Sequence, residues 1–217
     1  NWTAFDAVAL RGIRIENGGG SGVEGAGALA GTIQLSSVRW PEHFGAVSYG
    51  SRNSVDVDIS SGANIGEGHL MLSGNYSRGD GFVPIIAAQR GAVDGKAGYE
   101  SFGGGLRMVL PLTSGGSNGP TVEANIRGFD DRRSRGLPFS DNRNSGVDAS
   151  LRLLKNDGAM DVLALAYVQI RDFSAQFNSI AAGRVSASPT LDQFAVPSTG
   201  IGARIELRPQ IGKASQN

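Results

Sequence analysis

Two clusters in the chain have residue types and spacings that resemble ligand-binding loops. Five oxygen-bearing side chains between Asp56 and Glu67 lie near positions 1, 3, 5, 9 and 12 of a calcium-binding loop, but position 6 is Ser61 instead of the required glycine. The segment Gly91 to Ala97 resembles a phosphate-binding loop, but it has three residues between its glycines where that motif has four, and no Ser or Thr follows Lys96. We therefore interpret the first cluster as a strand with its turn and the second as ordinary loop composition.

The other candidates for catalysis or cofactor binding each lack a required partner. Gly25, Gly27 and Ala30 fit a dinucleotide fingerprint, but the run that follows them alternates like a strand instead of opening a helix. Ser21 lacks the second glycine of a nucleophile elbow because position 23 is Val. The sequence has no cysteine and only two histidines, His43 and His69, so we expect neither thiol chemistry nor a zinc or haem site. We predict no enzymatic activity, no cofactor and no metal site.

The composition narrows the class of protein further. The 217 residues include 20 basic and 20 acidic side chains, and this balance argues against a nucleic-acid binder, which has a basic excess. The longest apolar runs, such as Val162 to Val168, are far shorter than the roughly 20 residues of a membrane-spanning helix. They are compatible with a membrane β-barrel, whose strands need only about 9 to 11 residues. Because the sequence begins at Asn1 without an initiator Met or a signal segment, we expect an internal piece or a processed chain.

Alternation of apolar and polar residues predicts about eight strands that each have one apolar face. The pattern is clean from Val55 to Ser60, where three apolar residues alternate with two aspartates and a serine. Two short strands, Ile13 to Glu16 and Thr32 to Val38, precede this set, and Pro41 marks a boundary between two units. The eight predicted strands are Phe44 to Gly50, Ser54 to Ser60, His69 to Arg78, Tyr99 to Leu110, Thr121 to Gly128, Val147 to Arg152, Met160 to Arg171 and Ile201 to Arg208.

The predicted connections between these strands alternate in length. Apart from the first hairpin, at Gly50 to Asn53, short turns and long irregular stretches alternate strictly along the chain. Transmembrane barrels keep short turns at one end and long loops at the other, whereas a soluble sandwich has no reason to do so. The short turns are predicted at Gly62 to Glu67, Pro111 to Gly119 and Asn156 to Gly158, and the long stretches at Gly79 to Ala97, Asp131 to Arg143 and Ser174 to Ser198.

In a membrane, the apolar rows would face lipid and the alternating polar residues would face a lumen. So many charges could not all fill the dry interior of a small barrel without extensive pairing. The charged run Asp130 to Arg135 is interpreted as a solvated loop with local ion pairs, and a rim that contacts ligand or lipopolysaccharide is the alternative. The residues predicted to face the lumen are Asp56, Asp58, Glu123, Asn125, Arg127, Asp148, Arg152, Arg204, Glu206 and Arg208.

The segment Asn17 to Leu35 is dense in glycine and runs directly into an apolar strand. Glycine loses the most entropy on folding, so this density indicates a backbone that turns sharply or approaches another surface closely. The order of residues from Ile13 to Leu35 resembles the end of the plug domain of TonB-dependent outer-membrane receptors. In that family a short strand leads to a small-residue turn, a G-x-G-A-x-G-G motif and an apolar strand that enters the barrel. Asn17, Glu24 and Ala30 differ from the family's usual Arg, aromatic residue and Gly, and the matching residues are Gly18, Gly19, Gly20, Ser21, Gly25, Gly27 and Gly31.

The resemblance implies an all-β fold in two parts. Residues 1–38 would form the C-terminal part of the plug domain, and residues 39–217 the N-terminal strands of an antiparallel transmembrane β-barrel. The implied function is uptake of a scarce ligand, such as a siderophore–iron complex, cobalamin or a glycan, across the bacterial outer membrane. The implied partners are TonB, outer-membrane lipid and the small ligand, whose contacts no short motif identifies. Because such barrels close with about 22 strands, most of the barrel and the TonB-contacting segment would lie outside this sequence.

Two other hypotheses are open at this point. One is a complete eight-stranded outer-membrane barrel with a structural or adhesive role, although side chains fill the interior of such a barrel and leave no room for a glycine-rich insert. The other is a soluble β-sandwich binding module, in which the row Val55, Val57 and Ile59 would pack against a second sheet.

Overall fold

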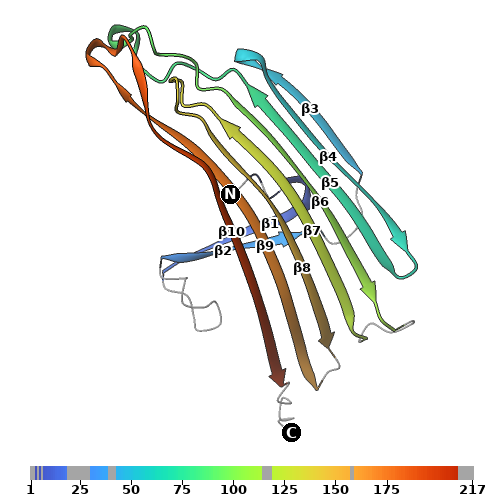
Figure 1. Ribbon diagram of the computed structural model, residues 1–217. Coiled ribbons are helices and arrows are strands. Elements are labelled where there is room, and N and C mark those ends of the chain that lie inside the picture. Colours follow the sequence, from blue (N-terminus) through green and yellow to red (C-terminus); the bar gives the residue numbers. More distant parts are fainter. Residues whose placement is uncertain are drawn as a thin grey trace.

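A computed structural model describes residues 3, 5, 7–18, 30–38, 43–113, 119–156 and 159–209 as an all-β protein (Figure 1). The N-terminal part forms a short 3-10 helix, η2 (Ala7–Ala9), and a two-stranded hairpin of β1 (Leu10–Asn17) and β2 (Gly31–Ser37). The rest forms one sheet. Its strands are β3 (Phe44–Gly50), β4 (Ser54–Ile65), β5 (Gly68–Gly79), β6 (Tyr99–Pro111), β7 (Thr121–Arg133), β8 (Asn142–Asn156), β9 (Met160–Ile180) and β10 (Ala187–Pro209).

The sheet has the simplest antiparallel topology, in which every strand pairs with its neighbours in sequence. The spatial order is β10-β9-β8-β7-β6-β5-β4-β3, so each connection is a hairpin. This confirms the predicted all-β class and all eight predicted strand positions. It does not give a closed barrel: within the described residues the sheet is open, and β3 and β10 are its two edges. The part of the chain that the structure describes contains no helix long and apolar enough to cross a membrane.

The predicted long irregular stretch from Ser174 to Ser198 is wrong. Strand β9 continues to Ile180, and β10 begins at Ala187, so only a tight turn that contains the 3-10 helix η5 (Ala182–Arg184) separates them. The prolines at positions 189 and 197 lie within β10, which is an edge strand, where a missing N–H need not break the ladder. Two register shifts, between Pro189 and Leu191 and between Gln193 and Val196, absorb the irregularity.

The predicted strict alternation of short and long connections is also wrong, although the longest connection lies where it was predicted. Residues 80–98 form that long loop, which contains the 3-10 helix η4 (Ala87–Gln89), between β5 and β6. At the same end of the sheet, β7 continues to Arg133, so the next connection shortens to residues 134–141. At the opposite end the connections are residues 66–67, 112–120 and 157–159, and part of the last two lies outside the described residues. The end that carries residues 80–98 is called the loop end below.

The register of the strands separates the side chains into two chemically different faces. Leu106 pairs with Leu72 on one side and Ile126 on the other, whereas the next residue, Arg107, pairs with Met71 and Asn125. Because side chains alternate across a sheet, residues paired in register share a face. The face that carries Leu106 and Ile126 is called the apolar face, and the one that carries Arg107 and Asn125 the polar face.

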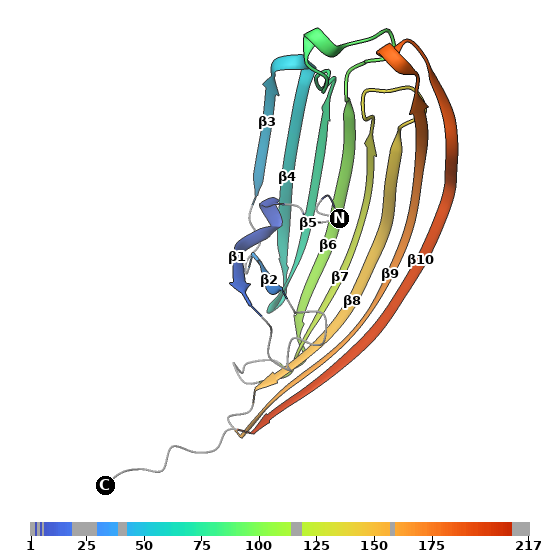
Figure 2. The ribbon, with the colours of Figure 1, turned by 90° about the vertical axis from the view of Figure 1, so that its left-hand side faces the viewer.

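The N-terminal hairpin lies against the polar face. Figure 2 shows the sheet curving around the side on which β1 and β2 lie. An Arg107 Nη1 atom donates to the carbonyl of Val38 at 2.5 Å, immediately after β2. The Arg127 guanidinium lies 5.3 Å from the centre of the Phe5 ring, and Thr3 Oγ1 donates to Asp131 at 3.3 Å. The hairpin therefore covers polar residues and leaves the apolar face open.

Candidate functional site

The apolar face forms a continuous uncharged band across the sheet. Its side chains are well exposed, as Val47 (76%), Ile201 (80%) and Ile205 (74%) illustrate. In the described part of the chain, the only hydrophobic residues that are buried are Met71, Phe129 and Ala175. An exposed apolar patch of this extent marks an interaction surface instead of a folded core. Its residues include Val47, Val57, Ile59, Leu70, Leu72, Phe102, Leu106, Met108, Leu110, Ala124, Ile126, Val147, Leu151, Val168, Ile170, Ile201, Ile205 and Leu207.

Charged residues bound this band at the loop end. On β6 the uncharged stretch runs from Phe102 to Leu110, which is about 27 Å along the strand at 3.4 Å per residue. Glu100 lies immediately above it on the same face and pairs in register with Arg78. On β7, Arg132 pairs in register with Glu100, and Asp130, level with Phe102 at the edge of the stretch, forms ion pairs with Arg132 and Arg143. The band has a height close to that of the lipid-facing belt of membrane barrels, about 25 Å.

The polar face is held by ion pairs that link neighbouring strands. Glu123 is 8% exposed and lies between two arginines, Arg107 at 3.4 Å and Arg152 in direct contact. On the adjacent pair of strands, an Arg171 Nη atom lies 2.6 Å from Asp148, and the guanidinium covers the Phe129 ring at 5.0 Å. These ion pairs compensate several of the charges on this face.

A polar cavity of about 650 Å³ separates the hairpin from strands β7 to β9. The hairpin contributes Arg11 and Gln34, and the sheet contributes amide side chains and charged side chains of both signs. The neighbouring contacts of Arg107, Arg127 and Asp131 hold the hairpin over this cavity. The two layers therefore meet through polar contacts and leave space between them.

At the loop end, the long loop reaches across the sheet to the β9–β10 turn. Arg184 Nε donates to both carboxylate oxygens of Asp94, at 2.7 and 3.0 Å, and the Asp94 side chain is only 2% exposed. These hydrogen bonds, with a further one from the backbone N–H of Gly91, lower the pKa of Asp94 to about 2. The N–H of Gly95 also donates to the carbonyl of Gly136 at 2.8 Å, which joins the third loop. Residues 80–98, 134–141 and 181–186 therefore form one interlocked cap.

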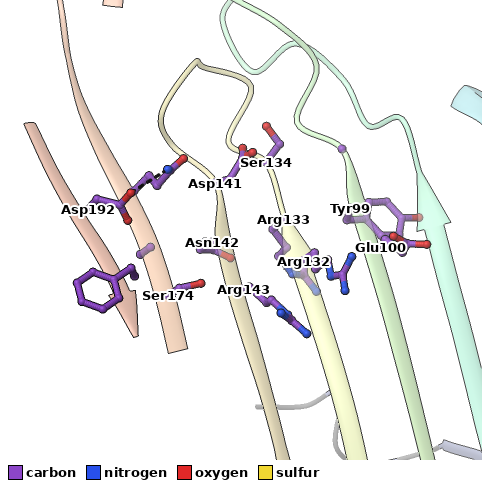
Figure 3. A pocket seen from close by; sticks show the side chains of 14 residues that line it. Tyr99, Glu100, Arg132, Arg133, Ser134, Asp141, Asn142, Arg143, Ser174 and Asp192 are labelled. Carbon is purple, nitrogen blue, oxygen red and sulfur yellow. Dashed lines mark hydrogen bonds between the residues drawn. The ribbon is translucent and has the colours of Figure 1, made fainter. Parts of the chain in front are cut away.

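An open pocket of about 440 Å³ lies at the loop end of strands β6 to β10 (Figure 3). Figure 3 shows three arginines, Arg132, Arg133 and Arg143, in its centre, with Tyr99 and Glu100 to one side and Asp192 to the other. Gln176 Nε2 donates to Asp192 at 3.2 Å. The pocket is therefore polar and of mixed charge.

A second pocket of about 430 Å³ adjoins the first and shares Gly98, Tyr99, Arg133 and Ser134 with it. Its other walls come from the β3–β4 turn, with Arg52, and from the long loop, with Phe82. Arg52 was not predicted to be a site residue, because nothing in its local sequence distinguishes it from other turn residues. Its unusual backbone is visible only in the structure and is described below.

The structure describes only part of the predicted plug motif. Gly18 and Gly31 lie where the connection between β1 and β2 begins and ends, with positive φ angles of 103° and 151°, and the N–H of Gly18 donates to the Ala30 carbonyl at 3.3 Å. Both angles fall where glycine is favoured, which gives these two residues a structural reason. Gly19, Gly20, Ser21, Gly25 and Gly27 lie outside the described residues.

The other candidate clusters lie within regular structure. The calcium-like residues from Asp56 onward extend along β4 and its turn instead of surrounding a point, and Asp56 binds the hydroxyls of Ser48 and Ser77. Among the described residues no group of three His, Cys, Asp or Glu side chains could hold a metal ion. Asp130 to Arg133 belong to β7, so the predicted loop begins later, although the predicted local ion pairs are present.

Comparison with known proteins adds no assignment. No protein-family model matches the chain, and no curated protein is significantly similar to it in sequence. The function is therefore inferred from the arrangement of the two faces, the hairpin and the loop end.

Proposed function

We propose that this chain is a portion of a TonB-dependent outer-membrane receptor, comprising the C-terminal end of its plug and eight strands of its barrel wall. The observation that carries the proposal is the division of one curved sheet into an uncharged exposed band and a polar face that holds a glycine-rich hairpin. In the proposed receptor, lipid covers the band and the plug fills the space next to the polar face.

The exposed surface of the chain supports an environment other than water. The accessible surface is 14024 Å², whereas the scaling for a folded soluble monomer of 22.5 kDa gives about 9,500 Å². Many large hydrophobic side chains of the apolar face are exposed, and in water they would favour aggregation. Lipid would satisfy this face without any further protein layer.

The hairpin supports the plug assignment. Its residues from Ile13 to Leu35 resemble the family's plug end in order, and Val38 and Phe5, which flank the hairpin in the sequence, contact the polar face. A barrel wall whose polar side receives the end of the plug matches the order of the two units in the sequence, residues 1–38 and then 39–217.

The proposed activity is uptake of a scarce small ligand, such as a siderophore–iron complex, cobalamin or a glycan, into the periplasm. The ligand would arrive at the loop end, where both arginine-containing pockets lie. TonB would provide the energy by pulling on the plug through a segment outside these residues. The protein is a transporter in this proposal and has no enzymatic role.

The two alternatives have less support. A complete eight-stranded barrel requires β3 and β10 to pair, and they are the separate edges of the described sheet. A soluble sandwich requires a second sheet over Val57 and Ile59, but the only other sheet in the described chain lies against the opposite face.

The first test is the length of the open reading frame. We expect it to continue by roughly a hundred residues upstream and by about fourteen strands downstream, since barrels of this class have about 22 strands and eight are present here. A frame that ended at Asn217 would exclude the receptor.

The second test is the environment in which the encoded protein folds. We expect it to fold in detergent or phosphatidylcholine vesicles, with proteolysis confined to the loop end and residues 102–110 protected. A monomer that folds in plain buffer without detergent would exclude both membrane hypotheses and favour the sandwich.

A further inference from the structure

Arg52 has a backbone conformation that its side chain does not favour. Ser51 to Ser54 form a tight turn in which Arg52 (φ 61°, ψ 36°) and Asn53 (φ 54°) are both left-handed. This turn type strongly prefers Asn and Gly at its two central positions, so an arginine there carries strain. A strained residue that is retained at the mouth of a pocket suggests a role in that pocket.

The surrounding contacts hold the turn firmly in this conformation. The N–H of Asp80 donates to the Arg52 carbonyl at 2.9 Å, and Asn53 Nδ2 donates to the Asp80 carboxylate at 2.9 Å. The Tyr49 hydroxyl donates to Asn53 Oδ1 at 3.1 Å, and Lys96 lies 3.2 Å from Asp80. The turn therefore presents the Arg52 side chain from a preorganised base.

Arg52 and Arg133 both line the second pocket and both retain unused hydrogen-bond donors. The Arg52 guanidinium lies 5.8 Å from the centre of the Phe82 ring, and no carboxylate pairs with it in the described part of the chain. Arg133 donates through Nε alone to Asp131, at 3.0 and 3.2 Å, so its two terminal nitrogens have no partner among the described residues. Each arginine can therefore offer a pair of parallel N–H groups to an oxyanion.

The rest of the pocket suits an anion attached to a flat or apolar body. Phe82 and Tyr99 provide aromatic surface, and Ser51, Ser54 and Ser134 provide hydroxyl groups. Among the residues that the structure describes, no acidic side chain lines this pocket. The geometry points to a binding site for a small organic polycarboxylate, with Arg52 and Arg133 each holding a carboxylate and the aromatic rings contacting the body of the ligand. This inference rests on the proposed function only in taking the polycarboxylate as the transported ligand or part of it.

The test measures binding of benzene-1,3,5-tricarboxylate by titration calorimetry to the chain, refolded in detergent or, if it folds there, in plain buffer. We expect saturable binding that weakens as salt rises, and no binding of the neutral tricarboxamide of the same shape. The decisive variant is Arg52→Gly, because glycine adopts the left-handed conformation freely and keeps the turn. We expect this variant to bind the tricarboxylate at least tenfold more weakly, with an unfolding midpoint equal to or above that of the original chain.

The matched control is Arg208→Gln, which removes a positive charge from the other end of the same face. Equal binding by Arg52→Gly and the original chain, or an equal loss in Arg208→Gln, would overturn the inference. Pyrophosphate bound more tightly than the tricarboxylate, with the same dependence on Arg52, would overturn the ligand class. The membrane proposal fails separately, because folding in plain buffer is scored before ligand is added. A chain that folds only with detergent and ignores the tricarboxylate leaves that proposal standing.

Discussion

The two faces of the sheet are built from the same strands and yet solve opposite problems. On the apolar face of β6 and β7, Leu106 and Ile126 are exposed and uncharged. On the polar face of the same strands, Arg107 and Glu123 are largely buried and form an ion pair. Several charges of the polar face form ion pairs within the chain, and Arg107 also donates to the carbonyl of Val38, next to the N-terminal hairpin. The apolar face has no protein partner in the described residues, so whatever stabilises it lies outside them. Substitutions placed on one face and matched on the other test this difference directly.

The largest effect is expected from a charge placed on the apolar face. Leu106→Arg introduces a guanidinium near the middle of the band, and an arginine at the bilayer midplane costs about 2 to 4 kcal/mol in membrane barrels. We expect the free energy of unfolding in phosphatidylcholine vesicles, measured by urea titration, to fall by that amount.

The matched control for this substitution is Gln169→Arg on the polar face, opposite Asp148 in the register. We expect a change below about 1 kcal/mol, because position 169 is exposed on the polar face and Asp148, which already pairs with Arg171, lies opposite it. Equal losses for the two variants would show that the faces do not differ in environment, and the membrane proposal would be abandoned.

A smaller effect is expected within the polar face. Glu123 and Glu206 each lie between two arginines. The side chains of the two arginines that pair with Glu123 are less exposed than those of the two that pair with Glu206. Glu123→Gln leaves Arg107 without its carboxylate in a largely buried position, so we expect a loss of about 1 to 3 kcal/mol. Glu206→Gln is expected to cost less than about 1 kcal/mol, as exposed ion pairs do.

Chemical denaturation of the two variants under one condition measures this ordering. A Glu206→Gln loss that matched or exceeded the Glu123→Gln loss would mean that the hairpin does not shield the central charges. The polar face would then resemble an ordinary solvated surface.

The strands and the two faces were predictable from the sequence because alternation is a local property. From Val55 to Ser60 the pattern alone identified which side chains share a face, and the register confirms it. Strand ends were less predictable. Residues 174–198 were predicted to be irregular, and the position of β10 at the edge of the sheet explains why Pro189 and Pro197 are tolerated within a strand.

The loop end could not be predicted, because its contacts join residues far apart in sequence. Asp94 and Arg184 are separated by 90 positions, and neither has a local pattern that indicates its partner. The strained backbone of Arg52 is equally invisible in the sequence, since Arg and Asn at a turn are common in many conformations. Local patterns thus predicted the strands of the sheet, whereas the pockets at the loop end depend on tertiary contacts.

A more local effect is expected where the hairpin meets the polar face. Arg107→Gln removes the hydrogen bond to the Val38 carbonyl as well as the ion pair with Glu123, whereas Glu123→Gln removes the ion pairs with Arg107 and Arg152 and keeps the hydrogen bond to Val38. A hydrogen bond from a charged donor contributes roughly 1.5 kcal/mol, which is about a tenfold change in an equilibrium. We expect amide hydrogen exchange in β1 and β2 to be faster in Arg107→Gln than in Glu123→Gln by about that factor, with β9 unchanged. Equal exchange in the two variants would mean that the hydrogen bond to Val38 does not hold the hairpin.

The smallest effect is expected from acid at the loop end, which lies outside both faces and so serves as their reference. The pKa of Asp94 is lowered to about 2 by hydrogen bonds from Arg184 and Gly91, against about 3.9 for an unfolded aspartate. A lowered pKa means that the Asp94–Arg184 contact contributes fully above about pH 4 and is lost as the pH falls through about 2. We expect hydrogen exchange in residues 80–98 and 181–186, corrected for the intrinsic rate, to stay constant from pH 7 to about 4 and to increase below that range. Asp94→Asn should show the faster exchange already above pH 4, because its neutral amide loses the charge-assisted pair, and the two proteins should converge once Asp94 is protonated. A step near pH 4 or above in the original chain would show that Arg184 does not hold the loop, and the cap would then be no more ordered than its separate loops.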